Sequence, residues 1–600
     1  MTIEGTHDKH TQQQKSHPEA DRLCQVARQQ MAKYEYPMAM ASFQQAVKIS
    51  ATCINAYVGM AELFQLHGNR NNALQLLSHA LKIEPKNSLV RRQMTPLIAE
   101  LTPTSFSLEL ERDLTHCISE PSIDHQLLAR VIGVHLSNKY LASTQLSSTN
   151  TTPELLQSLA TDSLFLLYLI RCINTNPGIE RWLTQIRKAL LLATLLPKDH
   201  NYTELVCAFA LQSFANEYVF VVSDAEEKQL TIIEGEIRSS SANTRFKLLL
   251  ACMYRPLFDF ADQHISLAQL PNTYLDLLIK RTLSDLQQEE QYRTSFSHIG
   301  EITSSKAENS ISDKVRNQYE ENPYPRWQIP PAPMQIPLTQ ILRQLPGVKQ
   351  QNLPKDNISV LVAGCGTGFE PIELARMDSS AQITALDLSS KSLAYAKRTA
   401  DELQISNIDF IQGNILDTAQ LNKKFDLINS TGVLHHMENP QAGWQVLCGI
   451  LKSGGVMRIS LYSEIARRRV VIAHQRIKEL ALGDSNKDIK TFRAHVFSQP
   501  AGSPLAELAH SDDFYSLSGC RDLLFHVQEH RFTLLQLKTI IAELGLIAVG
   551  FDAPAWARQQ FQQQHPNIKD ALDLVKWHEF ETTHPDTFVG MYALWLQKVE

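Results

Sequence analysis

Three glycines and one aspartate carry the clearest chemical signal in this chain of 600 residues. The glycines alternate in Gly364-Cys365-Gly366-Thr367-Gly368, which directly follows an apolar run at residues 358–363. Because glycine has no Cβ, such a loop lets the backbone approach a ligand closely. Asp387 lies 23 residues after Gly364, at the end of a second apolar run. Its carboxylate could accept hydrogen bonds from two ribose hydroxyls, so the pattern predicts a nucleoside site.

The main competing interpretation of this loop is a dinucleotide site. The dinucleotide pattern G-x-G-x-x-G requires glycine at position 369, and Phe369 stands there instead. A G-x-G-x-G loop is also not required to bind a phosphate group. The sequence therefore counts against a nicotinamide dinucleotide.

Short apolar runs alternate with helical stretches through the last half of the chain. The runs cover residues 358–363, 383–388, 408–412, 425–430 and 455–461, and two later runs cover 547–551 and 588–596. Strands that alternate with helices predict parallel βαβ units, with helices on both faces of the sheet. The glycine loop then follows the first strand at the carboxyl edge, where open α/β sheets bind ligands.

Five segments of this half resemble the class I methyltransferases in their order and spacing. They are 360–368, Ala385-Leu386-Asp387-Leu388-Ser389, Ile411-Gln412-Gly413-Asn414-Ile415, Phe425-Asp426-Leu427-Ile428 and Gly432-Val433-Leu434-His435-His436. The resemblance implies an α/β Rossmann-like domain that binds S-adenosyl-L-methionine.

The resemblance also implies a role for each residue of the predicted cofactor site. The loop residues Gly364, Cys365, Gly366 and Gly368 would flank the methionine part of the cofactor, and Asp387 with Leu388 would lie at its ribose. Asn414 and Ile415 would lie at the adenine, where Asn414 replaces the more usual aspartate. In this family a His435-His436 pair marks the end of the fourth strand, so no metal site is expected.

The entry segment, residues 317–327, is rich in aromatic side chains and prolines. Tyr319, Tyr324, Arg326 and Trp327 are the candidate catalytic residues, since aromatic faces and hydroxyl oxygens could hold a cationic amine. The alternative is that this segment only packs a linker against the domain. A second unusual stretch, the insertion at residues 462–543, is longer than a typical crossover and predicts an acceptor pocket.

The N-terminal part contains an internal repeat with a period of 34 residues. Ala27 aligns with Ala61, Ala39 with Ala73, Phe43 with Leu77 and Ala46 with Ala80. This spacing resembles the tetratricopeptide repeat, a helix–turn–helix unit. Residues 88–100 are predicted to form a capping helix, because two repeats alone bury their faces poorly.

The pattern divides the chain into five predicted parts. These are a disordered lead-in (1–19), helical repeats (20–100), an all-helical middle domain (105–294), a linker (295–312) and the methyltransferase domain with its insertion (313–600). In combination they resemble bacterial repeat-containing methyltransferases, notably the protein-lysine methyltransferases that modify rickettsial outer-membrane proteins. That resemblance implies lysine N-methylation of a protein substrate, such as an outer-membrane or secreted protein before its export. A small-molecule methyltransferase and a catalytically silent adaptor are the alternatives.

Composition and charge exclude several classes of partner. The formal net charge is -6, and no run of Lys and Arg forms a phosphate-binding stripe, so nucleic acid is not expected. The nine cysteines never form a C-x-x-C pair, and no apolar run is long enough to cross a membrane. These features predict a cytoplasmic protein in a reducing compartment. Whether the chain forms a homodimer stays open.

Overall fold

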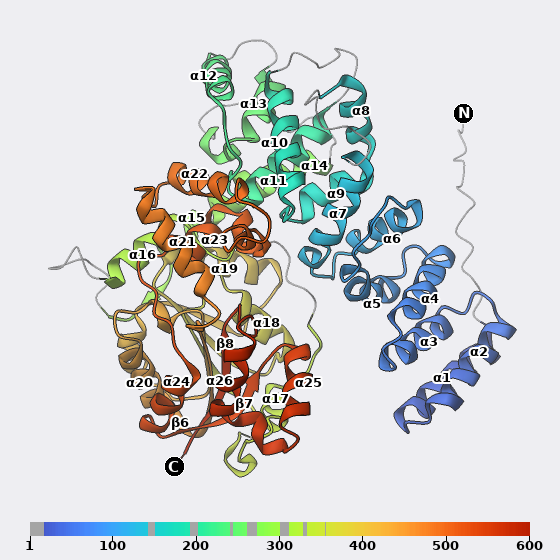
Figure 1. Cartoon of the computed structure of the whole chain (residues 1–600), viewed down its shortest axis with the longest axis vertical. Helices are drawn as coiled ribbons and strands as arrows, with labels where there is room; N and C mark the ends of the chain where they lie inside the picture. Colours follow the sequence, from blue (N-terminus) through green and yellow to red (C-terminus); the bar gives the residue numbers. More distant parts are fainter. Residues whose placement is uncertain are drawn as a thin grey trace, which may run out of the picture. The chain divides into compact units, whose positions relative to one another are not determined.

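A computed structural model describes residues 17–141, 151–192, 202–239, 244–260, 273–300, 311–327, 333–354 and 356–599 (Figure 1). The chain divides into two compact units, residues 1–147 with 163–168 and residues 148–162 with 169–600. Most of the lead-in predicted over 1–19 lies outside the described residues, and the first helix already begins at Pro18.

The first four helices form two hairpins, as the 34-residue period predicts. The small and apolar repeat positions are fully buried, because the helices of a hairpin approach closely there: Ala27, Phe43, Ala61 and Leu77 are 0% exposed. Gly59 allows the closest approach, since a Cβ there would lie 2.1 Å from Cζ of Phe43. The helices are α1 (Pro18–Ala32), α2 (Tyr36–Ile49), α3 (Ile54–Leu66) and α4 (Arg70–Ile83).

The helical stack continues beyond the boundary predicted at residues 100–105. The predicted capping helix is α5 (Ser88–Ala99), and α6 (Leu108–Ile118) and α7 (Ala129–Tyr140) belong to the same unit. Arg130 on α7 donates to the carbonyl oxygen of Ala99 at 2.9 Å, and Asn138 donates to that of Pro103 at 3.0 Å. The first of these bonds satisfies a carbonyl group that the end of α5 leaves free, and the second holds the chain just after it. The middle domain predicted over 105–294 is therefore not one unit.

The remaining helices of that predicted domain belong mainly to the second unit. Helix α9 contains the boundary between the two units, at residues 168 and 169. These helices are α8 (Pro153–Thr161), α9 (Ser163–Arg171), α10 (Pro177–Leu192), α11 (Thr203–Ala215), α12 (Asp224–Arg238), α13 (Thr244–Cys252), α14 (Thr273–Ile279) and α15 (Asp285–Tyr292).

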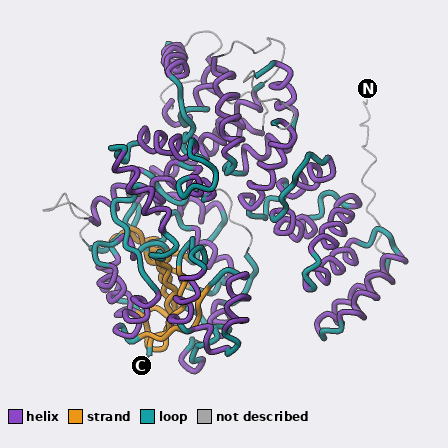
Figure 2. Tube along the Cα trace, in the orientation of Figure 1, coloured by secondary structure: helices purple, strands orange, loops and turns teal. Residues whose placement is uncertain are grey.

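Eight strands of the described residues form one mixed sheet in the order β1-β4-β3-β2-β5-β6-β8-β7. Figure 2 shows the strands in orange. The neighbouring pairs from β1 to β6 are parallel, whereas β8 runs antiparallel to both β6 and β7. All seven runs predicted as strands are present, but the antiparallel last strand was not predicted. The strands are β1 (Ser297–His298), β2 (Ser359–Ala363), β3 (Gln382–Asp387), β4 (Ile408–Gln412), β5 (Phe425–Thr431), β6 (Leu451–Leu461), β7 (Leu546–Asp552) and β8 (Tyr592–Lys598).

Helices cover both faces of this sheet, because the side chains of each strand alternate between two cores. Val360 and Val362 of β2 pack with α17 (Leu338–Arg343), α18 (Phe369–Met377) and α19 (Ser390–Glu402). Leu361 and Ala363 belong to the opposite core, with α20 (Pro440–Ile450), α24 (Leu534–Glu543), α25 (Ala555–Gln564) and α26 (Leu574–Thr583). The further helices are α16 (Ile311–Glu321), α21 (Arg468–Glu479), α22 (Asn486–Phe497) and α23 (Leu517–Leu524).

The linker predicted over 295–312 is wrong at its N-terminal end, where Ser297 and His298 form the edge strand β1. They pair with Ile411 and Gln412 of β4, and the N–H of Ile299 donates to the carbonyl oxygen of Gln412 at 3.0 Å. The polar composition hid this strand, because an edge strand of two residues needs backbone pairing rather than apolar side chains.

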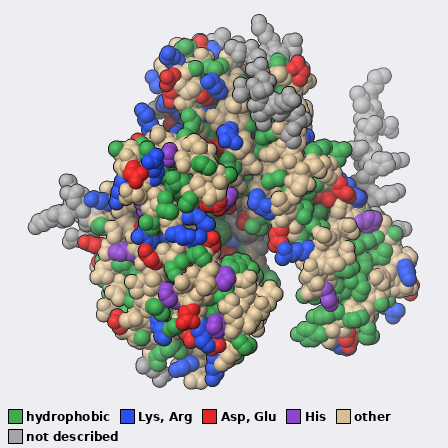
Figure 3. All heavy atoms as spheres, in the orientation of Figure 1, with side chains coloured by type: hydrophobic (Ala, Val, Ile, Leu, Met, Phe, Trp, Pro, Cys, Tyr) green, Lys and Arg blue, Asp and Glu red, His purple; other side chains and the backbone are tan. Residues whose placement is uncertain are grey.

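The surfaces of the helices give two further observations. In the parts of the chain that the structure describes, no helix is long and apolar enough to cross a membrane. Hydrophobic side chains gather on the visible face of the N-terminal helices (Figure 3). The exposed hydrophobic residues of helices α1 to α3 and their connections include Tyr34, Met38 and Leu66, at 79%, 56% and 61% exposure.

Candidate active site

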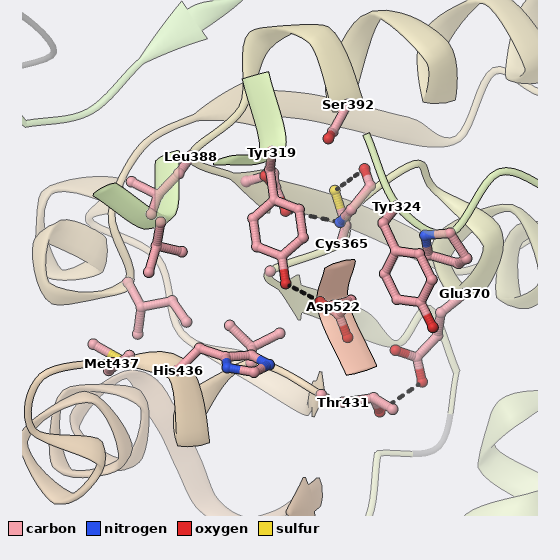
Figure 4. A pocket seen from close by; sticks show the side chains of 18 of the residues that line it. Tyr319, Tyr324, Cys365, Glu370, Leu388, Ser392, Thr431, His436, Met437 and Asp522 are labelled. Atoms are coloured by element: carbon pink, nitrogen blue, oxygen red, sulfur yellow. Dashed lines mark hydrogen bonds between the residues drawn. The ribbon is translucent and has the colours of Figure 1, made fainter. Parts of the chain in front are cut away.

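A cavity of about 420 Å³ lies at the carboxyl ends of β2, β3, β4 and β5 (Figure 4). The chain order reverses between β2 and β5, and open α/β sheets bind ligands at such a point. The volume is in the range of small-molecule and cofactor sites. Of the sequence-predicted residues, those that line it are Tyr319, Tyr324, Gly364, Cys365, Gly366, Asp387, Leu388, Asn414 and Ile415.

The glycine loop needs its glycines for conformation and packing as well as for access. Gly364 and Gly368 have φ of 77° and 86°, a region that side chains with a Cβ rarely adopt. A Cβ at Gly364 would lie 2.4 Å from Cγ2 of Val433, and one at Gly368 would lie 2.4 Å from Cβ of Ala396. Gly368 stands at the start of α18 and not on the cavity lining. Its role is therefore to let the loop meet α19.

Asp387 ends β3 with its carboxylate on the cavity. One oxygen accepts from the N–H of Gly366 at 2.7 Å, and the other accepts from the N–H of Ser389 at 2.9 Å. Burial raises the pKa of Asp387 to about 6, although these two hydrogen bonds favour the charged form. The side chain is thus held rigidly where the sequence predicts the ribose ligand.

Apolar side chains and one amide continue the cavity from Asp387 to the end of β4. Leu388 and Ile415 line it, and Ile415 is 6% exposed. The amide oxygen of Asn414 accepts from the N–H of Leu416 at 3.0 Å. One lone pair of that oxygen is therefore used within the chain, and a second remains for a ligand.

A charged pair that the sequence analysis missed lines the cavity beside the glycine loop. Arg458 on β6 donates to Glu370 of α18 at 3.3 Å, and Asn429 donates to the same oxygen at 3.0 Å. Burial raises the pKa of Glu370. Glu370 and Arg458 are 88 residues apart, so no local pattern could have joined them. Together they offer one group for a cation and one for an anion.

Tyr319 of α16 meets the insertion across the cavity (Figure 4). Its hydroxyl donates to Oδ1 of Asp522 on α23 at 2.7 Å and lies 3.2 Å from Nε2 of His526. Burial raises the pKa of Asp522, and burial beside this carboxylate raises that of Tyr319. The sequence analysis placed an acceptor pocket in the insertion but did not single out Asp522.

Tyr324 forms a second pair of the same kind. Its hydroxyl donates to Oδ1 of Asp513 at 2.6 Å. Burial raises the pKa of Asp513 to about 6, and the nearby Asp522 adds to this effect. We call Tyr319, Tyr324, Asp513 and Asp522 the acceptor wall. In it, two tyrosines of the entry segment are each bonded to one carboxylate of the insertion.

His436, Asp522 and His526 come close enough to be considered as a metal site, with ligand atoms within 4.8 Å of one another. The hydrogen bonds of the two histidines do not favour metal binding. Nδ1 of His526 accepts from the N–H of Gln528 at 3.1 Å, so its proton is assigned to Nε2, which cannot then bind a metal. Nδ1 of His436 lies 2.7 Å from the carbonyl oxygen of Gln528 and carries the proton there. Burial lowers the pKa of His436, which favours its neutral form.

Arg326 and Trp327, two of the predicted catalytic residues, do not lie on the cavity lining. Nε of Arg326 is 3.4 Å from Oε1 of Glu217. Trp327 donates from Nε1 to Oγ1 of Thr367 at 3.1 Å and packs edge-on against Tyr395. Both side chains anchor the entry segment outside the cavity, whereas Tyr319 and Tyr324 line it.

Comparison with known proteins agrees with this geometry. Residues 354–499 match the family described as a methyltransferase domain. The C-terminal half of this chain contains a class I S-adenosylmethionine-dependent methyltransferase domain. The matched residues run from just before β2 to the end of α22, so they include the glycine loop, Asp387 and Asn414 but not the entry segment.

Individual relatives cover only part of this protein. An uncharacterized protein of Synechococcus sp. is 33% identical over 255 residues, which are 39% of this chain and 60% of that protein. A release factor glutamine methyltransferase of Flavobacterium psychrophilum is 42% identical over 74 residues, 12% of this chain and 26% of that protein. The chain thus spans less than two thirds of the length of each of these relatives.

Among solved structures, PKMT2 from Rickettsia typhi in complex with AdoHcy is matched with a TM-score of 0.34. The identity is 17%, and the match covers 45% of this chain and 54% of that one.

The lining of the methyltransferase cavity fits S-adenosylmethionine. The carboxylate of Asp387 suits ribose hydroxyls, and the apolar side chains of Leu388 and Ile415 suit a purine ring. Glu370 and Arg458 match the ammonium and carboxylate of an amino acid. The binding groups are therefore present for each part of the cofactor.

Proposed function

We propose that this protein is an S-adenosylmethionine-dependent methyltransferase that methylates the side-chain nitrogen of lysine in a protein substrate. The observation that carries the proposal is the acceptor wall, because Tyr319, Tyr324 and Asp522 line the same cavity as the cofactor residues. Carboxylates and aromatic faces both attract a cationic amine. A lysine ammonium is the common protein group with that character.

The hydrogen bonds of the acceptor wall also orient such an amine. Tyr319 and Tyr324 each give their hydroxyl proton to a carboxylate. The phenolic oxygen of Tyr324 therefore keeps lone pairs that can accept from an amine N–H, and that of Tyr319, which also accepts from Nε2 of His526, keeps one. Two acceptors, each fixed by its own carboxylate, would hold the nitrogen in one place, and such placement supplies much of the rate of a transfer reaction.

The amine must lose a proton before it can react, since the lysine ammonium has a reference pKa near ~10.4 and no free lone pair. Asp522 is the group that we propose takes this proton. Burial raises its pKa, which brings its proton affinity closer to that of the amine and makes the transfer less unfavourable. When bound, S-adenosylmethionine supplies a methyl group on a sulfonium sulfur, and its carbon–sulfur bond breaks as the nitrogen–carbon bond forms.

A polypeptide substrate is proposed over a metabolite because of the N-terminal helices. Their exposed hydrophobic residues, such as Tyr34, Met38 and Leu66, offer a surface that could recruit a protein. The tetratricopeptide resemblance of the hairpins supports the same role. In the small-molecule alternative these helices would serve assembly only, and the acceptor would be a free amine.

A silent adaptor is the less favoured function. An adaptor would not need Asp387, Glu370 and Arg458 to remain together on a cavity. Buried ionisable groups carry a desolvation cost, which a site without a ligand has no reason to keep.

The deciding experiment is incubation of the purified protein with methyl-labelled S-adenosylmethionine and a bacterial lysate. We expect label in protein, recovered after hydrolysis as Nε-methylated lysine. Label that appears only in small molecules would support the metabolite alternative. No label in either fraction, with cofactor binding intact by calorimetry, would support the adaptor.

A further inference from the structure

The acceptor wall is held from outside the methyltransferase domain, by the turn that follows α11. We propose that Glu217 in this turn is a positioning residue: its carboxylate ties the entry segment to the N-terminus of α23. It would thereby fix Tyr324 and Asp522 on the cavity. Glu217 belongs to the helical stretch that the sequence analysis assigned to a separate middle domain.

The backbone of this turn is unusual. Glu217 and Tyr218 are consecutive residues with φ of 58° and 60°, in the left-handed region that residues other than glycine rarely adopt. The turn is closed by the N–H of Tyr218, which donates to the carbonyl oxygen of Ser213 at 2.6 Å. Such a conformation persists only where surrounding contacts determine it, and it is common at functional sites.

Glu217 contacts both segments at once. Its Oε1 is 3.4 Å from Nε of Arg326, whose guanidinium also lies over the ring of Phe214. Its Oε2 accepts from the N–H of Ser518 at 2.5 Å. Ser518 is in the first turn of α23, where backbone N–H groups lack partners within the helix and a negative charge is stabilising. One carboxylate with 13% of its side chain exposed thus pairs with Arg326 by charge and accepts a hydrogen bond from Ser518.

Each of the two partners, Arg326 and Ser518, is close in sequence to a residue of the acceptor wall. Arg326 is two residues from Tyr324, and α23 carries Asp522 toward its C-terminal end. A neighbouring contact joins the same turn to the N-terminus of α23, since the N–H of Leu517 donates to the carbonyl oxygen of Asn216 at 3.3 Å.

A buried ion pair also joins the insertion to the helices around α11. Arg493 of α22 forms two hydrogen bonds to Glu180 of α10, at 3.0 and 2.8 Å. The same guanidinium donates to the carbonyl oxygen of Phe514 at 2.7 Å, next to Asp513. The helices around α10 and α11 are therefore part of the support of the acceptor wall.

Hydrogen exchange on the full chain tests the proposal with variants that separate the two contacts. Glu217→Gln keeps an oxygen for the N–H of Ser518 but loses the charge that holds Arg326, and Glu217→Ala loses both. Arg326→Ala removes only the partner in the entry segment. Glu204→Gln, an exposed glutamate on α11, is the matched control.

We expect exchange in residues 319–327 to become about tenfold faster in all three test variants. Exchange in residues 516–524 should become faster only in Glu217→Ala. Residues 359–388 and the affinity for S-adenosylhomocysteine should stay as in the wild type and in Glu204→Gln. Unchanged exchange in both segments, or faster exchange throughout the sheet, would overturn the positioning role.

The activity arm rests on the proposed function. With labelled cofactor and the lysate as probe, Glu217→Ala should lower incorporation into protein about tenfold, and Glu217→Gln less. Full incorporation in a Glu217→Ala variant with loosened segments would overturn the link to catalysis. If the wild type labels no protein, the proposed function fails, while the exchange experiment still decides whether Glu217 holds the two segments.

Discussion

The two halves of the cavity are built in different ways. Most residues of the cofactor half lie in one stretch, residues 364–415, around the carboxyl ends of β2, β3 and β4, whereas Arg458, which pairs with Glu370, lies on β6. The acceptor wall joins residues 319 and 324 to residues 513 and 522, which are about two hundred positions away. Its supporting residue Glu217 comes from a third region. The cofactor half is thus encoded mostly locally, whereas the acceptor half depends on tertiary contacts.

The substitution that should separate the two halves most strongly is Asp522→Asn, which removes one charge and keeps the size of the side chain. Without a carboxylate to take the proton of the amine, we expect turnover on the labelled lysate acceptor to fall about 100-fold, or about 3 kcal/mol. Affinity for S-adenosylhomocysteine should change less than about twofold. Asp484→Asn, an exposed site in the same insertion, is the control. Equal loss of binding and turnover would show that the halves are not separable.

The pH dependence of turnover tests the same carboxylate in the wild-type protein. Asp522 must be ionised to take a proton, so activity is lost as pH falls through its pKa. Because burial raises this pKa, the acidic limb of the turnover profile should lie above the ordinary range of an aspartate. In Asp522→Asn that limb should disappear from the residual activity.

Asp387→Asn tests the cofactor half. The amide keeps one acceptor oxygen but loses the charge that strengthens hydrogen bonds from ribose. We expect calorimetry to show about thirtyfold weaker binding of S-adenosylhomocysteine, with the fold retained by circular dichroism. Since the pKa of Asp387 is about 6, wild-type affinity should also weaken as pH falls below that value. Asp409→Asn, exposed on β4, should bind normally, and normal binding by Asp387→Asn would remove the ribose assignment.

Removal of single hydroxyls should have a smaller effect. Tyr319→Phe and Tyr324→Phe each keep the aromatic face but lose the oxygen that orients the amine and the bond to Asp522 or Asp513. We expect turnover to fall about tenfold in each, with unchanged cofactor affinity. Full turnover in both folded variants would mean that the entry segment only packs against the domain.

The smallest effect should come from the N-terminal helices. Combined Tyr34→Ser, Met38→Ser and Leu66→Ser should raise KM for the lysate acceptor about threefold and leave the turnover number and cofactor affinity unchanged, because these side chains would act through recruitment. Ile568→Ser, 83% exposed in the second unit, is the control. Unaltered kinetics in the triple variant would rule out this surface for recruitment.

Much of the fold could be predicted from local pattern, and the exceptions are informative. Five of the seven predicted strands, β2 to β6, lie in the parallel part of the sheet, where burial on both faces requires continuous apolar runs. Strand β1 was missed because two polar residues at a sheet edge leave no such pattern. The boundary near residue 100 was misplaced because Arg130 and Asn138 bond back to Ala99 at the end of α5 and to Pro103 just after it, and side chains that bond across about 30 positions have no periodic signal.

By itself, the sequence determined the part of the cofactor half that lies between Gly364 and Ile415, but not the pairing of Glu370 with Arg458. The glycine loop, the carboxylate of Asp387 and the end of β4 follow one another at the short spacing that two consecutive βαβ units impose, so this pattern can be read without coordinates. Only the tertiary structure decided the acceptor half. It placed Tyr319 against Asp522, Tyr324 against Asp513 and Arg326 against Glu217. The reason is physical: hydrogen bonds between distant segments are specified by the packing of whole elements, and residue order alone does not record which of them meet.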